Sequence, residues 1–158
     1  IPASAPVRNN LGIALAAQGQ LAAAAREFEE ALRVDPDSAA AHRNLGDVLS
    51  SQGRTDEALP HLRRTVELAP NDGPARYDLA VVLLEAGRAA EAETQLRAAL
   101  TLIPPSADAH NNLGIALGSQ GRLQEALAQF ERALAIDPSS ADALRNLQMA
   151  REGLAGGR

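Results

Sequence analysis

The chain repeats itself with a period of 34 residues. Residues 107–140 recur, with substitutions but without insertions, as 73–106, 39–72 and 5–38. A period of this size is typical of helical hairpins that cannot bury their apolar faces alone and therefore stack on their neighbours. We expect one all-α domain over residues 1–158, a solenoid of four helix-turn-helix repeats with these boundaries.

Recurring glycines and prolines mark where the helices end. The glycines near the middle of the repeats are Gly19, Gly53, Gly87 and Gly121. Glycine adopts the left-handed conformation of a helix C-cap, so each one predicts a tight turn between two antiparallel helices. The prolines near the repeat ends are Pro36, Pro70, Pro104 and Pro138. Proline cannot continue a helix, and the Ser and Asp residues that follow several of them are suitable N-caps for the next helix.

The apolar pattern continues beyond the fourth repeat. Ala141, Leu144, Leu147 and Leu154 keep the helical spacing of a first helix, but no second helix follows them. The last repeat of an array otherwise exposes the apolar face that internal repeats bury. We therefore expect a capping helix over residues 141–154.

The composition limits the classes of partner. The net charge is −5, from 20 acidic and 15 basic residues, with no block of like charge. This balance argues against nucleic acid, because phosphate backbones are bound by clustered positive charge. The absence of cysteine excludes disulfides and thiolate metal sites. No apolar run approaches the roughly 20 residues of a membrane span, so we expect no membrane contact by this segment.

Aromatic residues make up only 2% of the chain, which predicts a core of alanine and leucine with closely spaced helices. The chain begins at Ile1, without an initiator methionine or a signal-peptide pattern. We therefore expect a fragment of a larger protein. Its compartment stays open, with the cytoplasm favoured.

One polar position also recurs, directly before the aliphatic position early in each first helix. The residues at this position are Asn10, Asn44, Asp78, Asn112 and, in the capping helix, Asn146. One amide per repeat can donate to and accept from the backbone of an extended peptide. Alternatively, each asparagine can bond to the neighbouring repeat and tie the solenoid together.

These features together resemble the tetratricopeptide repeat family. The first and fourth repeats match its signature at nearly every place, with Leu11, Gly12, Leu15, Ala24, Phe28, Ala31 and Pro36, and with Leu113, Gly114, Leu117, Ala126, Phe130, Ala133 and Pro138. The resemblance implies a right-handed superhelix whose first helices line a concave groove that binds proteins. The family's bulky aromatic residue early in the first helix is replaced by Arg8, His42, Arg76 and His110.

The recurring asparagines look like the ladder of the tetratricopeptide region of O-linked N-acetylglucosamine transferases, whose amides hold a peptide backbone. Asp108 and Asp142, four residues before Asn112 and Asn146, match the acidic ladder of that region in part. The alternative is that these carboxylates interact only with the dipoles of their helices. The further groove candidates next to the ladder are Arg43, Tyr77, Asn111 and Asp47.

The sequence contains no catalytic constellation and no glycine-rich phosphate loop, so we expect neither an enzyme nor a cofactor. His42 and His110 are too far apart to share a metal ion, and we expect His61 to be solvated. The favoured function is a noncatalytic scaffold or adaptor that binds a peptide or helix of a partner protein in the groove. The alternatives are the substrate-recognition arm of a larger enzyme, such as a glycosyltransferase, and a structural scaffold that associates with copies of itself.

Overall fold

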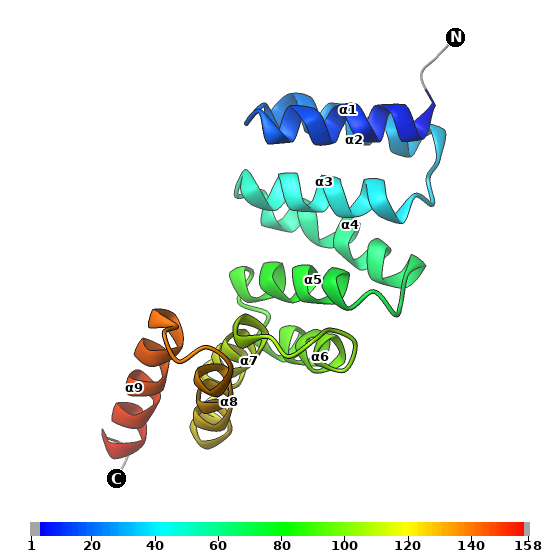
Figure 1. The fold of residues 1–158 in the computed structure, drawn as a ribbon. Coiled ribbons are helices and arrows are strands. Elements are labelled where there is room, and N and C mark those ends of the chain that lie inside the picture. The colour runs from blue at the N-terminus through cyan, green and yellow to red at the C-terminus, as the bar shows by residue number, and fades with distance from the viewer. Residues whose placement is uncertain (1–3, 157–158) are drawn as a thin grey trace. The chain divides into compact units, whose positions relative to one another are not determined.

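The computed structural model describes residues 4–156, and every regular element in that range is an α-helix. Nine helices follow one another (Figure 1). They are α1 (Ala5–Ala17), α2 (Leu21–Val34), α3 (Ala39–Ser51), α4 (Thr55–Leu68), α5 (Gly73–Glu85), α6 (Ala89–Leu100), α7 (Ala107–Ser119), α8 (Leu123–Ile136) and α9 (Ala141–Gly156). None of these helices is both long and apolar enough to cross a membrane.

The helices form two compact units, which divide between Asn71 and Asp72. Unit 1 contains α1 to α4, and unit 2 contains α5 to α9. In unit 1, α1 pairs with α2, α3 pairs with α4, and α2 packs against α3. In unit 2, α5 pairs with α6, α7 pairs with α8, and α6 packs against α7. The predicted helical-repeat fold is therefore confirmed.

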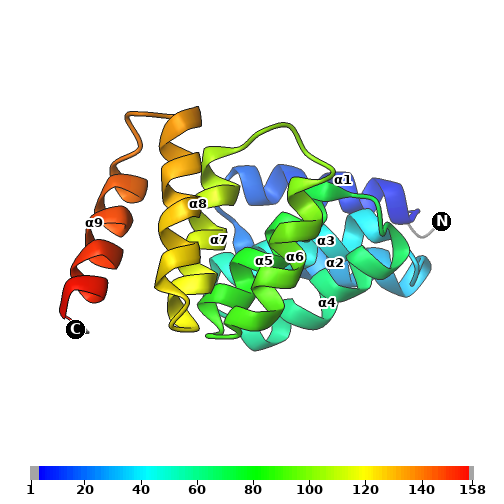
Figure 2. The same cartoon turned by 90° about the horizontal axis from the view of Figure 1, so that it is seen from below.

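The capping helix predicted at the C-terminal end is present as α9. It packs against α8 and α7, and both views place it beside α8 (Figures 1 and 2). Its buried residues are Ala143, Leu147 and Ala150, which face the fourth repeat as predicted for a cap.

The turn glycines have the predicted left-handed conformation. Gly19, Gly53, Gly87 and Gly121 have φ values of 74°, 72°, 70° and 77°. The next repeat then begins with a side-chain cap. Ser38, Asp72, Ser106 and Ser140 each accept a hydrogen bond from the backbone N–H three residues later. These four caps recur with the repeat period, so the same local signals start and end the helices in both units.

Small residues bring the two helices of each hairpin together. A Cβ atom added to Gly12 would lie 2.5 Å from the ring of Phe28, and one added to Gly114 would lie 2.4 Å from the ring of Phe130. Both rings are almost completely buried. The glycine therefore leaves the room that the facing phenylalanine fills, and hairpin closure depends on this pairing.

The third repeat departs from the pattern at its C-terminal end. Helix α6 ends at Leu100, four residues before Pro104, whereas α2, α4 and α8 end two residues before their prolines. Leu102 and Ile103 lie outside the helix and against Gly73, at the start of α5. A Cβ atom on Gly73 would lie 2.6 Å from Cγ2 of Ile103, so this contact requires a glycine. Ile103 thereby reaches the N-terminal end of α5.

Helix α1 leaves an apolar face uncovered. Leu11 is 47% exposed, whereas Leu45, one repeat later on α3, is only 1% exposed because α2 packs against α3. The equivalent residues of unit 2, Leu79, Leu113 and Leu147, are also buried. Val7 on the same helix is 57% exposed, while Ala41, its counterpart on α3, is completely buried.

Candidate peptide-binding site

The recurring asparagines connect the first helices of consecutive repeats. Asn44 donates a hydrogen bond from Nδ2 to Oδ1 of Asn9 over 2.9 Å, from α3 to α1. Asn112 donates in the same way to the hydroxyl oxygen of Tyr77 over 3.0 Å, from α7 to α5. Asn146 donates to Oδ1 of Asn111 over 2.9 Å, from α9 to α7. Each amide reaches a residue 35 positions earlier, so these asparagines tie neighbouring repeats together.

The ties use only part of the hydrogen-bonding capacity of each amide. A carboxamide has two N–H donors and an oxygen with two lone pairs, and the tie occupies one N–H. Within residues 4–156, the Oδ1 atoms of Asn44, Asn112 and Asn146 accept no hydrogen bond, and no buried side-chain oxygen lacks a partner. These three oxygens are therefore not fully buried, and the tie fixes the orientation of the amides that carry them.

The other ladder positions differ. Asn10 is exposed on α1, and Asp78 is partly buried on α5. Arg43 and Asp47 lie on α3 beside Asn44, with Asp47 exposed and Arg43 partly buried. Within residues 4–156, the amide tie is observed at Asn44, Asn112 and Asn146.

Tyr77, Asp78 and Asp108 meet at a pocket of about 210 Å³ in unit 2. Its other lining residues are Pro74, Ile103 and Ser106. Burial raises the pKa of Tyr77, and the negative charges of Asp108 and Asp78 raise it further, against the hydrogen bond from Asn112. The phenol therefore stays protonated at neutral pH and keeps its O–H as a donor.

Asp142 does not join this cluster. Its carboxylate pairs with Arg145 over 3.2 Å on the surface of α9, and both side chains are largely exposed. This pair has the spacing of an ordinary helix-surface ion pair. Of the two carboxylates of the predicted acidic ladder, Asp108 lines the pocket of about 210 Å³, whereas Asp142 forms a surface ion pair.

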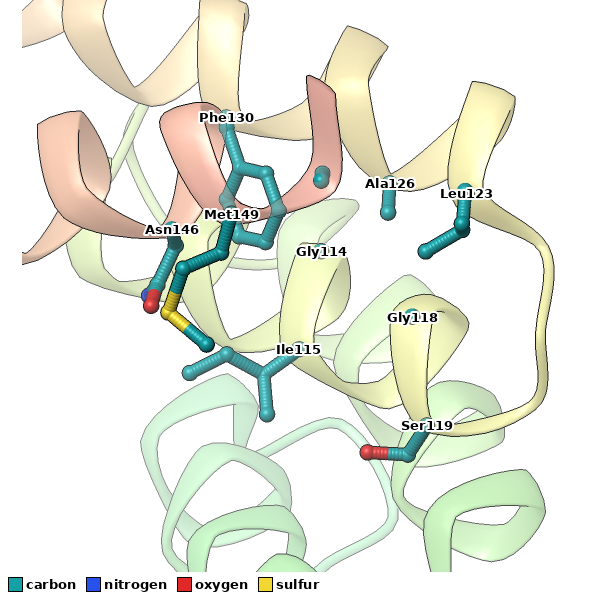
Figure 3. A pocket seen from close by; sticks show the side chains of 10 residues that line it. Gly114, Ile115, Gly118, Ser119, Leu123, Ala126, Phe130, Asn146 and Met149 are labelled. Carbon is teal, nitrogen blue, oxygen red and sulfur yellow. The ribbon is translucent and has the colours of Figure 1, made fainter. Parts of the chain in front are cut away.

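Asn146 also borders a second pocket, of about 330 Å³, between α7, α8 and α9 (Figure 3). The walls are mainly apolar and include Ile115, Leu123, Phe130 and Met149. The sequence prediction missed this pocket. Its one signal in the sequence is Gly118, where the preceding repeat has Leu84.

A second set of polar pairs lies within the hairpins, between the first and second helices. The pairs, each separated by 19 residues, are Arg8–Glu27 at 3.0 Å, His42–His61 at 3.0 Å, Arg76–Gln95 at 2.8 Å and His110–Gln129 at 3.0 Å. The first residue of each pair stands at the position where the family has a bulky aromatic residue early in the first helix. The expectation of a solvated His61 is therefore wrong: His61 is half-buried and bonds to His42.

The two histidines share one proton between facing nitrogens. Nε2 of His42 lies 3.0 Å from the carbonyl oxygen of Pro36, to which it can only donate. Nδ1 of His42 then accepts from Nδ1–H of His61 in the neutral pair. Burial lowers the pKa of His61, the charge of His42 lowers it further, and Glu29 opposes both effects. In the described part of the chain, no group of three or more His, Asp or Glu side chains is arranged to hold a metal ion.

The comparisons with known proteins agree with this architecture. The family model for the tetratricopeptide repeat matches residues 9–73, 47–107 and 77–141. No protein of curated function matches the chain significantly.

Several solved structures share the fold. A crystal structure of MamA protein is 24% identical, with a TM-score of 0.90 over 96% of this chain and 82% of that one. MamA from Desulfovibrio magneticus is 21% identical, with a TM-score of 0.84 over 96% and 92% of the two chains. The MamA of AMB-1 is 29% identical, with a TM-score of 0.78 over 85% and 79%.

Proposed function

Because the chain belongs to the tetratricopeptide repeat family and is a protein-interaction scaffold module, we propose that it holds an extended segment of a partner protein along the first helices of unit 2. The observation that supports this proposal is the Oδ1 atom of each tied asparagine, which is not fully buried and accepts no hydrogen bond within residues 4–156. We propose that the module itself is noncatalytic and acts as a scaffold or adaptor.

The tied amides suit backbone recognition. Asn112 and Asn146 lie on α7 and α9, which pack against each other. Packed helices are about 8–10 Å apart, and an extended chain advances about 3.3 Å per residue. The ladder oxygens of Asn112 and Asn146 therefore suit peptide residues that are two or three positions apart. Each can accept a backbone N–H whatever the sequence of the partner.

Fixing the amides in advance also favours binding. An asparagine that is already bonded to the preceding repeat has lost its rotamer freedom during folding, so peptide binding does not have to order it. Each hydrogen bond to the peptide contributes about 0.5–1.5 kcal/mol, and several act together. The tie and the ligand contact therefore use different atoms of the same side chain and do not compete.

A selection from a library of unstructured random peptides, displayed on phage, would test the proposal. The affinities of the selected peptides would then be measured by isothermal titration calorimetry. Replacing Asn112 and Asn146 together with alanine removes two acceptors and should weaken binding by about 30-fold, from two terms of ~1 kcal/mol.

The matched control is Tyr77→Phe. It removes the acceptor of the Asn112 tie but leaves the Asn112 amide in place. If the amide oxygens hold the peptide, Asn112→Ala should weaken binding about fivefold more than Tyr77→Phe at a comparable loss of stability. Equal effects of the two single variants would show that Asn112 acts only as a tie between repeats, and would refute the proposal.

A further inference from the structure

The pocket of about 330 Å³ in unit 2 is lined in part by a residue without a side chain, Gly118 (Figure 3). Gly118 on α7 faces this space. A Cβ atom placed on it would meet only the Cβ of Ala126, at an ordinary contact distance of 3.8 Å. Gly114, one turn earlier, is different, because a Cβ atom there would lie 2.4 Å from Phe130. Close packing therefore requires a glycine at 114 but not at 118.

Gly118 also lies inside a helix, where glycine is costly. It destabilises a helix by about 1 kcal/mol relative to alanine. In the 34-residue register, the residues at the same place are Leu84, Ser50 and Ala16. The fourth repeat thus leaves empty a place where the third repeat of the same chain has a leucine.

The lining of the pocket defines what would occupy it. Ile115, Leu123 and Phe130 are apolar, and Met149 at the rim is 61% exposed. A methionine side chain is flexible and adapts its shape to an apolar partner. The volume is at the lower end of the range that holds small ligands. The amide of Asn146 lies on the same pocket, and its Oδ1 atom is not fully buried and accepts no hydrogen bond within residues 4–156.

We propose that this pocket receives a leucine-sized aliphatic side chain of the bound peptide, while Oδ1 of Asn146 accepts a backbone N–H next to that residue. The inference rests on the proposed function, since it gives the peptide an anchor. Leu84 supplies the size of the occupant, and the apolar walls exclude a charged one. The pocket of the fourth repeat would then select for an aliphatic residue, whereas the amides bind the peptide backbone whatever its sequence.

Met149 provides a direct probe, because it is the only methionine of the sequence. The protein would be labelled with 13C at the methionine methyl group and titrated with N-acetyl-leucine methylamide. The alanine and lysine analogues serve as control probes. The leucine probe should shift the Met149 signal in a saturable manner, with nuclear Overhauser effects from its methyl groups to Met149 and to the ring of Phe130. Contacts only to exposed residues elsewhere, such as Val7, or no saturable shift would overturn the inference.

The variant Gly118→Leu tests the pocket by placing a leucine side chain inside it. The variant should fill the space, abolish the shift and melt at the same or a higher temperature, so that lost binding cannot be attributed to unfolding. The matched control is Ala16→Leu, at the same register position in unit 1, which should leave the shift unchanged. If Gly118→Leu folds less well, the Overhauser contacts in the unaltered protein still decide the question.

The two proposals can fail separately. For peptides selected from the random library, replacing an anchoring leucine with alanine should weaken binding by at least about tenfold. Peptides that bind Gly118→Leu normally but lose affinity for Asn112→Ala would refute the pocket and leave the proposed function intact. Peptides that bind all these variants equally well would refute both.

Discussion

The side-chain amide of Asn146 donates a hydrogen bond to Oδ1 of Asn111 over 2.9 Å, which joins the capping helix α9 to α7. Asn111 is buried, and Asn146 is partly buried. The same relationship joins Asn112 to Tyr77 and Asn44 to Asn9. Asparagine recurs at the donor position, whereas the acceptor is an amide oxygen in two ties and a hydroxyl oxygen in the third.

A double-mutant cycle should measure the strength of this tie. We expect Asn111→Ala and Asn146→Ala to lower the free energy of unfolding individually, and to show a coupling of about 0.5–1.5 kcal/mol when combined. Urea denaturation followed by circular dichroism would supply the four values. Additive losses would mean that the hydrogen bond contributes nothing to stability.

Two glycines of one helix should respond in opposite directions to the same substitution. Gly114→Ala forces a methyl group against Phe130 and should destabilise the protein by about 1–3 kcal/mol, reduced by the gain in helix propensity. Gly118→Ala meets only an ordinary contact and should stabilise it by up to about 1 kcal/mol. Thermal unfolding of the two variants provides the comparison. Equal shifts of the midpoint would contradict the assigned packing.

The His42–His61 pair should make stability depend on pH. The pKa of His61 is lower in the folded state than the ordinary value of 6.5, so the unfolded chain binds the proton first as the pH falls. The free energy of unfolding should therefore decrease as the pH drops below about 6.5, and level off below the folded-state pKa. The measurement is urea denaturation across this pH range.

The repeats themselves supply a control for the histidine prediction. His61→Gln reproduces the pairing of His110 with Gln129, which lie 3.0 Å apart in the fourth repeat. This variant should fold and lose the contribution of His61 to the pH dependence. A pH profile that is unchanged in His61→Gln would rule out His61 as its source.

Removal of α9 should weaken unit 2. A chain that ends after Ser140 uncovers the surface now packed by Ala143, Leu147 and Ala150, which should lower the free energy of unfolding by about 3 kcal/mol and promote association. Thermal melts and light scattering would report the two effects. A chain that ends after Gly153 keeps these three residues and should behave like the full chain. Identical behaviour of both truncated chains would contradict the capping role.

The sequence predicts well those features that local signals determine. Gly121 predicts a left-handed turn because few other residues adopt that conformation, and Ser38 predicts a helix start because its hydroxyl accepts from a nearby backbone N–H. Both signals lie within a few residues of their effect. Because these signals recur every 34 residues, the repeat fold follows from short-range chemistry.

The site is less predictable, because it depends on distances between helices. The pairing of His61 with His42 requires the register of the closed hairpin, which brings together residues 19 positions apart. The pocket beside Gly118 depends on the absence of a side chain, and a single glycine in a helix has no specific meaning by itself. Comparison with Leu84 in the preceding repeat supplies that meaning, but only when the repeats are aligned.

The uncovered face of α1 allows a further repeat to be engineered ahead of it. Leu11 and Val7 occupy the positions that receive a preceding second helix everywhere else within the units. A duplicate of residues 5–38 inserted ahead of Ala5, in the same register, would bring its own second helix onto these two side chains without altering an existing contact. The molecule can therefore serve as a modular building block that is lengthened by whole repeats at the N-terminal side of unit 1.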